Sequence, residues 1–395
     1  MATGTEGNDN LTNDPSNGVE TIDALGGDDV ITIQPGAPGA YVVVKGGSGY
    51  DTLILNDTVH RMIVANSSGY DGTIWFRHGM SSFFEVNWTS IERLELTGIL
   101  SPASTNVFGE EVDILRFGTA PAPSEGIHTI TTNGGNDEIY LSGQPVYPGA
   151  SVVVNSGTGA DIVDFSGITV SGAGTGFCWT ADGGDGNDTL KGSSFRDALK
   201  GDAGNDNLHL YLGGDDVAEG GAGLDNFFFG AALTAADVVT GGADADTLVI
   251  QGDYPGGVTL SANITQIENV SILAGSNTAF GEPGTNRYDY VLTTNDANFA
   301  AGVQARINGA ALLEGEDFTF NGSAETDASY VVYGGKGRDT LLGGLGNDIF
   351  FYAEERFASG DTVNGGPGYD GMFLRGNYTI DFNAPGYTGL FTNIE

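Results

Sequence analysis

Aspartates recur every nine residues in part of this sequence, each time beside glycines. From Gly183 to His209 the chain reads "GGDGNDTLKGSSFRDALKGDAGNDNLH", which is three blocks of nine residues. Each block places Asp sixth and Leu eighth, which gives Asp188, Asp197 and Asp206. Carboxylates in such a series could bind a hard cation, form catalytic acid pairs or simply favour tight turns. Recurrence beside fixed glycines favours cation binding.

The same block recurs along much of the chain. The opening run continues to "GGAGLDNFF", and "GGKGRDTLLGGLGNDIFF" is a second tandem pair. Two copies, "ALGGDDVIT" and "TNGGNDEIY", are weaker, and "GSSFRDALK" lacks its second and fourth glycines. The predicted metal ligands are the acidic residues of all copies: Asp9, Asp29, Asp51, Asp137, Asp161, Asp188, Asp197, Asp206, Asp215, Asp225, Asp246, Asp339, Asp348 and Asp370.

Simple geometry predicts how these aspartates are arranged. Glycines supply the positive φ angles that a tight turn needs, and the last three residues of a block alternate as a very short strand. Two blocks then form one coil of 18 residues, so aspartates two blocks apart stack on the same side. We therefore expect Asp188 to share an ion with Asp206 rather than with Asp197. Asp197 should pair with Asp215 more weakly or not at all.

The blocks resemble the RTX, or haemolysin-type, calcium-binding nonapeptide family, whose pattern is G-G-x-G-x-D-x-U-x with U a large apolar residue. "GGDGNDTLK", "GGKGRDTLL" and "GGSGYDTLI" match every defined position. The resemblance implies a parallel β-roll with several calcium ions in its turns. It also implies a bacterial protein exported by type I secretion and located outside the cell or on its surface. We expect an elongated all-β fold of parallel β-roll (β-solenoid) modules with inserted β-rich segments.

A longer unit contains two acidic turns separated by a Pro/Gly-rich or Ala-rich excursion. The spacings are 51 − 29 = 22, 161 − 137 = 24, 246 − 225 = 21 and 370 − 348 = 22 residues. Each spacing is one coil plus a few residues on the opposite turn, so the two aspartates of a unit should face each other across one calcium. Three units end in a similar tail, "SIERLEL", "QIENVSI" or "NIE", which we interpret as a closing strand.

The repeats and the segments between them suggest five parts. We predict a first β-roll unit over residues 1–55, a β-rich insertion over 56–130, a central β-roll over 131–250, a second insertion over 251–330 and a C-terminal β-roll unit over 331–395. The insertions are rich in aromatic residues and alternating Thr and Val. Trp75, Trp88 and Trp179 could be stacking platforms for carbohydrate, although burial in a core is the favoured interpretation.

Composition excludes several classes of function. The net charge of −38 opposes binding to nucleic acid or anionic lipid, and 39% hydrophobic residues suffice for a core once cations neutralise the carboxylates. The single Cys178 cannot form an intramolecular disulfide, and no apolar run is long enough to span a membrane. The sequence contains neither H-E-x-x-H nor G-x-S-x-G, which argues against a zinc protease or a lipase.

These observations favour a non-enzymatic, calcium-dependent structural protein of the cell surface or exterior: a surface-layer, filament, matrix or adhesin component that folds on binding calcium after secretion. Its expected partners are calcium, further copies of itself and cell-surface polysaccharide. The alternatives are the calcium-binding roll of a secreted hydrolase or polysaccharide-modifying enzyme, and a glycan-binding module. Because a block starts at Gly4 and the chain stops inside a motif, we expect a piece of a longer protein; the alternative is a natural terminus whose last strand is completed by a neighbour or by a terminal cap.

Overall fold

The computed structural model describes most of the chain, and it separates into two units, Met1–Asp206 and Asn207–Glu395. Between residues 56 and 128, and at residues 143 and 151, the backbone alone is described. The described residues are 2–14, 19–34, 40–68, 71–78, 82–89, 93–100, 105–107, 112–119, 127–143, 151–168, 179–279, 284–378 and 390–395.

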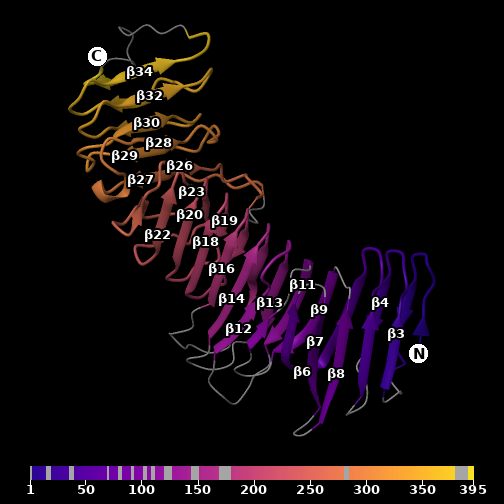
Figure 1. The fold of residues 1–395 in the computed structure, drawn as a ribbon. Helices are drawn as coiled ribbons and strands as arrows, with labels where there is room; N and C mark the ends of the chain where they lie inside the picture. The colour runs from indigo at the N-terminus through magenta and orange to yellow at the C-terminus, as the bar shows by residue number, and fades with distance from the viewer. Residues whose placement is uncertain are drawn as a thin grey trace. The chain divides into compact units, whose positions relative to one another are not determined.

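The first unit is built of parallel strands that alternate between two columns (Figure 1). One column contains β2 (Asn10–Thr12), β4 (Val30–Ile33), β6 (Thr52–Ser68), β9 (Arg93–Leu100), β11 (Val112–Thr119), β13 (Glu138–Gly143), β15 (Ile162–Ile168) and β17 (Thr189–Lys191). The other contains two runs: β1 (Ala2–Thr3), β3 (Val19–Asp23), β5 (Tyr41–Lys45) and β8 (Ser82–Thr89), then β10 (Thr105–Val107), β12 (Ile127–Thr131), β14 (Ser151–Thr158), β16 (Trp179–Asp185) and β18 (Asp197–Ala203). Strand β7 (Asp71–His78) is antiparallel to β6 and β8.

The second unit repeats this plan. Its longest parallel column contains β19 (Asn207–His209), β21 (Asn226–Phe229), β23 (Thr247–Ile250), β26 (Asn269–Ile272), β28 (Gln304–Asn308), β30 (Ser329–Tyr333), β32 (Ile349–Tyr352) and β34 (Gly371–Leu374). Strands β20 (Val217–Ala222), β22 (Val238–Ala243) and β25 (Ile264–Thr265) form a shorter column. A separate parallel sheet contains β24 (Val258–Thr259), β27 (Tyr290–Thr293), β29 (Phe318–Asn321), β31 (Asp339–Leu342), β33 (Thr362–Asn364) and β35 (Phe391–Thr392).

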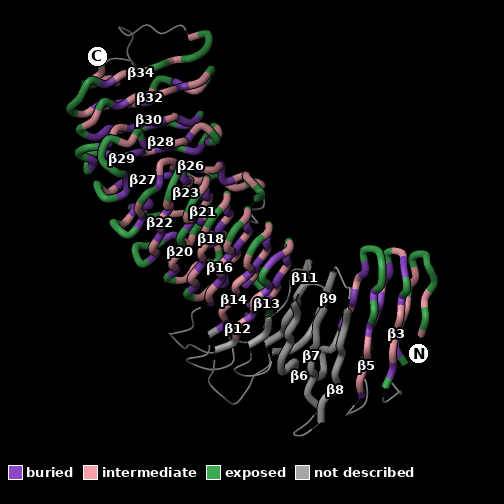
Figure 2. The backbone as a smooth tube through the Cα atoms, in the orientation of Figure 1, coloured by how far each residue is buried: buried purple, intermediate pink, exposed green. Residues whose placement is uncertain are grey.

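The core of each unit lies between its columns. Along β16, Trp179 and Ala181 are buried while Thr180 and Asp182 are partly exposed, as the period of two in a strand requires. Figure 2 shows buried and intermediate segments alternating along the described strands. Within residues 183–209 the Leu residues of the nine-residue blocks are fully or nearly buried, with Leu190 and Leu208 at 0% exposure and Leu199 at 2%. The apolar eighth place therefore points into the solenoid, and the coil is held together by stacked apolar side chains.

The predicted all-β fold is confirmed: each unit is a parallel β-solenoid, and the helical structure of the described residues is one 3-10 turn, η1 (Asp296–Asn298). The five-part division stays a prediction. Within its two insertions, β9 and β11 continue the column from β6 to β13, and β26, β28 and β30 continue the column from β23. Across the described residues we find no helix of the length and hydropathy needed to cross a membrane.

Candidate metal centres

An acidic residue lies at the start of many short strands, where a turn ends. Its carboxylate accepts a hydrogen bond from the backbone amide of the equivalent residue one coil earlier. For example, the amide of Asp161 donates to Oδ1 of Asp188, and the amide of Asp188 donates to Oδ1 of Asp206, each at 2.8 Å. We call the acidic residues joined by such bonds, whether through the donating amide or the accepting carboxylate, the inner ladder: Asp9, Asp29, Asp51, Asp137, Asp161, Asp188, Asp206, Asp216, Asp225, Asp237, Asp246, Glu268, Asp339, Asp348, Asp361, Asp370 and Glu395.

The structure brings together the aspartate pairs that spacing predicts. The amide-to-Oδ1 distances are 3.0 Å for Asp29 and Asp51, 2.8 Å for Asp137 and Asp161, 2.9 Å for Asp225 and Asp246, and 2.8 Å for Asp348 and Asp370. These bonds join residues 21 to 24 positions apart, whereas Asp188 and Asp206 are 18 apart. Stacking of aspartates one coil apart is therefore confirmed, and an ion shared by each pair stays a proposal.

The residue just before several inner-ladder aspartates forms a second set of hydrogen bonds between coils. In this set the accepting side chain belongs to the earlier coil and the donating amide to the later one. The Oδ1 atom of Asn136 accepts from the amide of Ala160 at 2.8 Å, and that of Asn187 accepts from the amide of Asn205 at 2.7 Å. Asn8, Asp28 and Asn347 make the same contact. These bonds hold successive turns in register.

The second carboxylate oxygen of the inner ladder is what a cation would bind. In Asp29, Asp188, Asp246 and Asp370, Oδ2 is buried and has no hydrogen-bond partner among the described residues. A buried, unsatisfied charged oxygen destabilises a fold by roughly 1–3 kcal/mol or more. Such a group calls for a compensating charge, and a bound divalent cation supplies one.

Glycine in the first place of the block makes room for this oxygen. A Cβ atom on Gly183 would lie 2.3 Å from Oδ2 of Asp188, and one on Gly365 would lie 2.3 Å from Oδ2 of Asp370. Any side chain there would fill the space beside the carboxylate. The donor set is therefore carboxylate and backbone carbonyl oxygens around a protected space, which fits calcium.

Later glycines of the turn are required by backbone stacking. Gly186 has φ of +142°, and a Cβ atom there would lie 1.4 Å from the carbonyl oxygen of Gly159 in the preceding coil. Because only glycine tolerates both the dihedral angle and the approach, this turn depends on it.

Burial raises the pKa of several inner-ladder carboxyls. Desolvation is the largest cause for Asp188, whose pKa is raised to about 7, with the charges of Asp161 and Asp206 adding to the effect. Desolvation also raises the pKa of Asp246 to about 7 and that of Asp339 to about 8, and neighbouring acidic charges act in the same direction. Without a cation, these carboxyls would therefore be only partly ionised near neutral pH.

One predicted ligand, Asp215, lies outside the inner ladder, while Asp197 behaves as its incomplete block predicts and does not stack on Asp215. Asp215 is exposed, and its neighbour Asp216 is buried in the inner ladder with its amide 2.9 Å from Oδ1 of Asp237. The turn before β20 contains one residue more than the nine-residue block, which moves the ladder position from Asp215 to Asp216. Asp197 is buried, but its Oδ2 accepts from the backbone amide of Ser193 at 2.7 Å, and the Ser193 hydroxyl also contacts it.

Sequence analysis missed several members of the inner ladder. Asp237 and Asp361 lie in turns without the glycine pattern. The sequence feature that could have identified them is an Asp directly before a short strand. Glu268 and Glu395 belong to the Ile-Glu tails. Their side chains accept from the amides of Asp246 and Asp370 at 2.9 and 2.7 Å, so a Glu replaces Asp at these rungs. Glu92 of the third tail lies outside the described residues.

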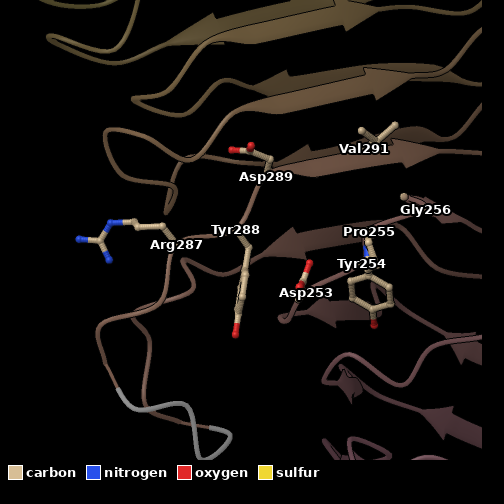
Figure 3. A pocket seen from close by; sticks show the side chains of 9 residues that line it. Asp253, Tyr254, Pro255, Gly256, Arg287, Tyr288, Asp289 and Val291 are labelled. Carbon is tan, nitrogen blue, oxygen red and sulfur yellow. The ribbon is translucent and has the colours of Figure 1, made fainter.

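An open cavity of about 550 Å³ lies away from the inner ladder, in the second unit (Figure 3). Its polar side chains are used to hold loops: Tyr254 contacts the carbonyl of Gly230, and Asp289 accepts from the amide of Asp317 at 2.8 Å. Figure 3 shows Arg287 pointing away from Tyr254.

The proposed tryptophan platform is incomplete. Trp179 is only 3% exposed, and its ring centroid lies 6.0 Å from that of Phe165 in the core. It packs as the core alternative expected and cannot stack against an external sugar. The side chains of Trp75 and Trp88 lie outside the described residues.

Comparison with known protein families identifies the RTX calcium-binding nonapeptide repeat, in four copies, at residues 182–215, 231–249 and 331–354. No curated protein matches the chain. The matched stretches include the turns of Asp188, Asp206, Asp246 and Asp348. The pairs formed by Asp29 with Asp51 and by Asp137 with Asp161 lie outside them, yet they have the same hydrogen-bond geometry.

Proposed function

The chain carries RTX calcium-binding repeats and binds several calcium ions, and from this premise we propose that it is a structural protein of the bacterial exterior. In this proposal it is secreted, folds on binding calcium, and serves as a surface-layer, filament, matrix or adhesin component without catalytic activity. The observation that carries the proposal is the inner ladder, in which Asp29, Asp188, Asp246 and Asp370 each bury an Oδ2 atom that has no hydrogen-bond partner among the described residues. Type I secretion and assembly with further copies or with cell-surface polysaccharide belong to the same proposal.

The inner-ladder residues would hold the calcium ions, which supply positive charge that the chain lacks. Asp29, Asp188, Asp246 and Asp370 each have one oxygen fixed by an amide and one left for an ion. With a net charge of −38, mutual repulsion opposes folding when calcium is scarce. A ligand that binds only the folded state stabilises it by RT ln(1 + [L]/Kd), so folding follows the external calcium concentration.

Far-ultraviolet circular dichroism tests this proposal. The full chain is measured in excess EDTA and then titrated with calcium, with magnesium at equal ionic strength as the control. We expect a β signal that develops cooperatively with calcium. A β signal that is complete in EDTA and unchanged by calcium would overturn the proposal.

The enzyme alternative is less well supported. A catalytic carboxyl pair should combine shifted pKa values with a cleft. Apart from Asp182, the carboxyls with a raised pKa lie in turns or at strand starts: Asp161, Asp188, Asp197, Asp237, Asp246, Asp339, Asp348, Asp361 and Asp370. These are the places where the proposed function puts calcium, so the raised pKa values do not by themselves favour catalysis.

A further inference from the structure

Three acidic residues of the second unit gather outside the RTX repeats. One carboxylate oxygen each from Asp296, Glu325 and Asp327 lies within 4.8 Å of those of the other two. Asp296 begins η1, and the other two lie in the turn between β29 and β30. This part of the chain falls between the matched segments 231–249 and 331–354, so no nonapeptide repeat accounts for the cluster.

Glu325 provides an independent reason to expect a ligand. Its side chain is 0% exposed. Oε1 accepts from three backbone amides, those of Thr326 at 3.0 Å, Asp327 at 3.1 Å and Ala328 at 2.9 Å. Oε2 is equally buried and has no hydrogen-bond partner among the described residues. Such an oxygen is costly to bury unless something positive contacts it.

Protein groups do not supply that positive charge. Within the described part of the chain, no Lys, Arg or His forms an ion pair with Asp296, Glu325 or Asp327. Asp296 and Asp327 are exposed, so an ion can reach the cluster from solvent. Three carboxylates that converge on a solvent-accessible point form a donor set for a hard divalent cation.

The cluster lies where the inner ladder is interrupted. The amide that donates to Oδ1 of Asp348, at 2.7 Å, comes from Tyr330. A tyrosine therefore occupies the position that Asp348 holds in the next coil, and the strand register places Ala305 there in the preceding coil. Asp296 and Thr326 instead link the two coils: Oδ1 of Asp296 accepts from the amide of Thr326 at 2.9 Å and from its hydroxyl at 2.7 Å.

We propose that Asp296, Glu325 and Asp327 bind one calcium ion, at a site distinct from the RTX turns. Glu325 supplies the buried oxygen, and the two aspartates supply the exposed ones. The ion joins η1 to the turn before β30 and thereby clamps two coils where the inner ladder lacks an aspartate.

Calcium stoichiometry of the full chain tests the site. Asp296→Asn/Asp327→Asn removes two charges, while the amide oxygen introduced in place of the Asp296 carboxylate can still accept the bonds from Thr326. Glu219→Gln/Glu314→Gln is the matched control, because both residues are exposed and the change in charge is the same. Native mass spectrometry should count one calcium fewer in the Asp296→Asn/Asp327→Asn variant than in the control and the wild type.

Circular dichroism in calcium verifies that each variant is folded, and the single Asp327→Asn variant replaces the double variant if folding is lost. Equal calcium counts and equal titration curves for the variant and its control would overturn this site. A wild-type chain that binds no calcium at all would instead contradict the proposed function, so the two failures are distinguishable.

Discussion

The backbone amide of Asp188 donates a 2.8 Å hydrogen bond to Oδ1 of Asp206, which lies one coil later. Oδ1 of Asp188 is in turn fixed by the amide of Asp161, and its Oδ2 is buried without a hydrogen-bond partner among the described residues. Asp188 therefore uses one oxygen to fix the register between coils, and under the proposed function its other oxygen binds an ion. On that proposal the same residue aligns successive coils and makes their stability depend on calcium.

Asp188→Asn should act in opposite directions with and without calcium. In calcium it removes a ligand, and we expect a lower melting temperature and a loss of roughly 1–3 kcal/mol in the free energy of unfolding. In EDTA it removes a buried charge, so the folded form should become more stable. Thermal unfolding in both buffers measures this, with Asp185→Asn, an exposed residue of the same turn, as the control. Parallel changes in both buffers would contradict a ligand role.

Asp216 and Asp215 provide a test of the ladder register. Asp216 is 2% exposed and Asp215 is exposed, although the two are adjacent and chemically identical. Asp216→Asn should lower calcium affinity by several-fold, and Asp215→Asn should leave it nearly unchanged. Isothermal titration with calcium compares them. A larger effect of Asp215→Asn would place the ligand where the nine-residue spacing predicts it.

Without calcium, stability should fall as pH rises. Asp188 and Asp246 have folded-state pKa values of about 7, and Asp339 of about 8, against an ordinary value of 3.8. Folding thus favours the protonated carboxyls, so their stabilising contribution is complete below the ordinary pKa and is lost as pH rises through about 7 to 8. In calcium the trend reverses, because protons compete with the ion.

Unfolding midpoints in EDTA and in calcium, measured from about pH 5 to 8.5, test this dependence. A midpoint in EDTA that rises with pH would show that the buried carboxyls are stabilised as anions by something other than calcium.

Gly186→Ala should destabilise the fold even in saturating calcium. The positive φ alone costs roughly 1–3 kcal/mol for a residue with a side chain, and the contact with the Gly159 carbonyl adds to it. Gly256→Ala is the control, because a Cβ atom at that position would have no heavy atom within 4 Å outside its chain neighbours. Chemical denaturation should give a near-normal midpoint for the control only; equal midpoints would mean that the turn can relax around a methyl group.

The sequence was sufficient to predict the stacking of aspartates one coil apart. Glycines and alternating apolar residues fix the turn and the short strand, so the Asp188–Asp206 and Asp29–Asp51 pairs followed from counting. The count failed at Asp215, because one extra residue in a turn moves the ladder position without changing the local composition. Only the strand that follows, β20, identifies Asp216.

Other parts of the site depend on contacts that spacing does not encode. Glu268 and Glu395 reach the ladder because a longer side chain still places an oxygen at the preceding amide. Asp296 lies close to Glu325 although the two residues are 29 positions apart, which is not a multiple of the nine-residue block. The repeated Ile-Glu tail marks Glu268 and Glu395 in the sequence but does not reveal their contact with the ladder. No local pattern marks the approach of Asp296 to Glu325.

A crystal structure of the full chain grown in calcium, with anomalous scattering used to locate the ions, tests the account most directly. It predicts calcium peaks about 2.3–2.6 Å from Oδ2 of Asp188 and of the other inner-ladder aspartates in glycine turns. Peaks absent from those turns, with Oδ2 contacting only water or protein donors, would contradict it.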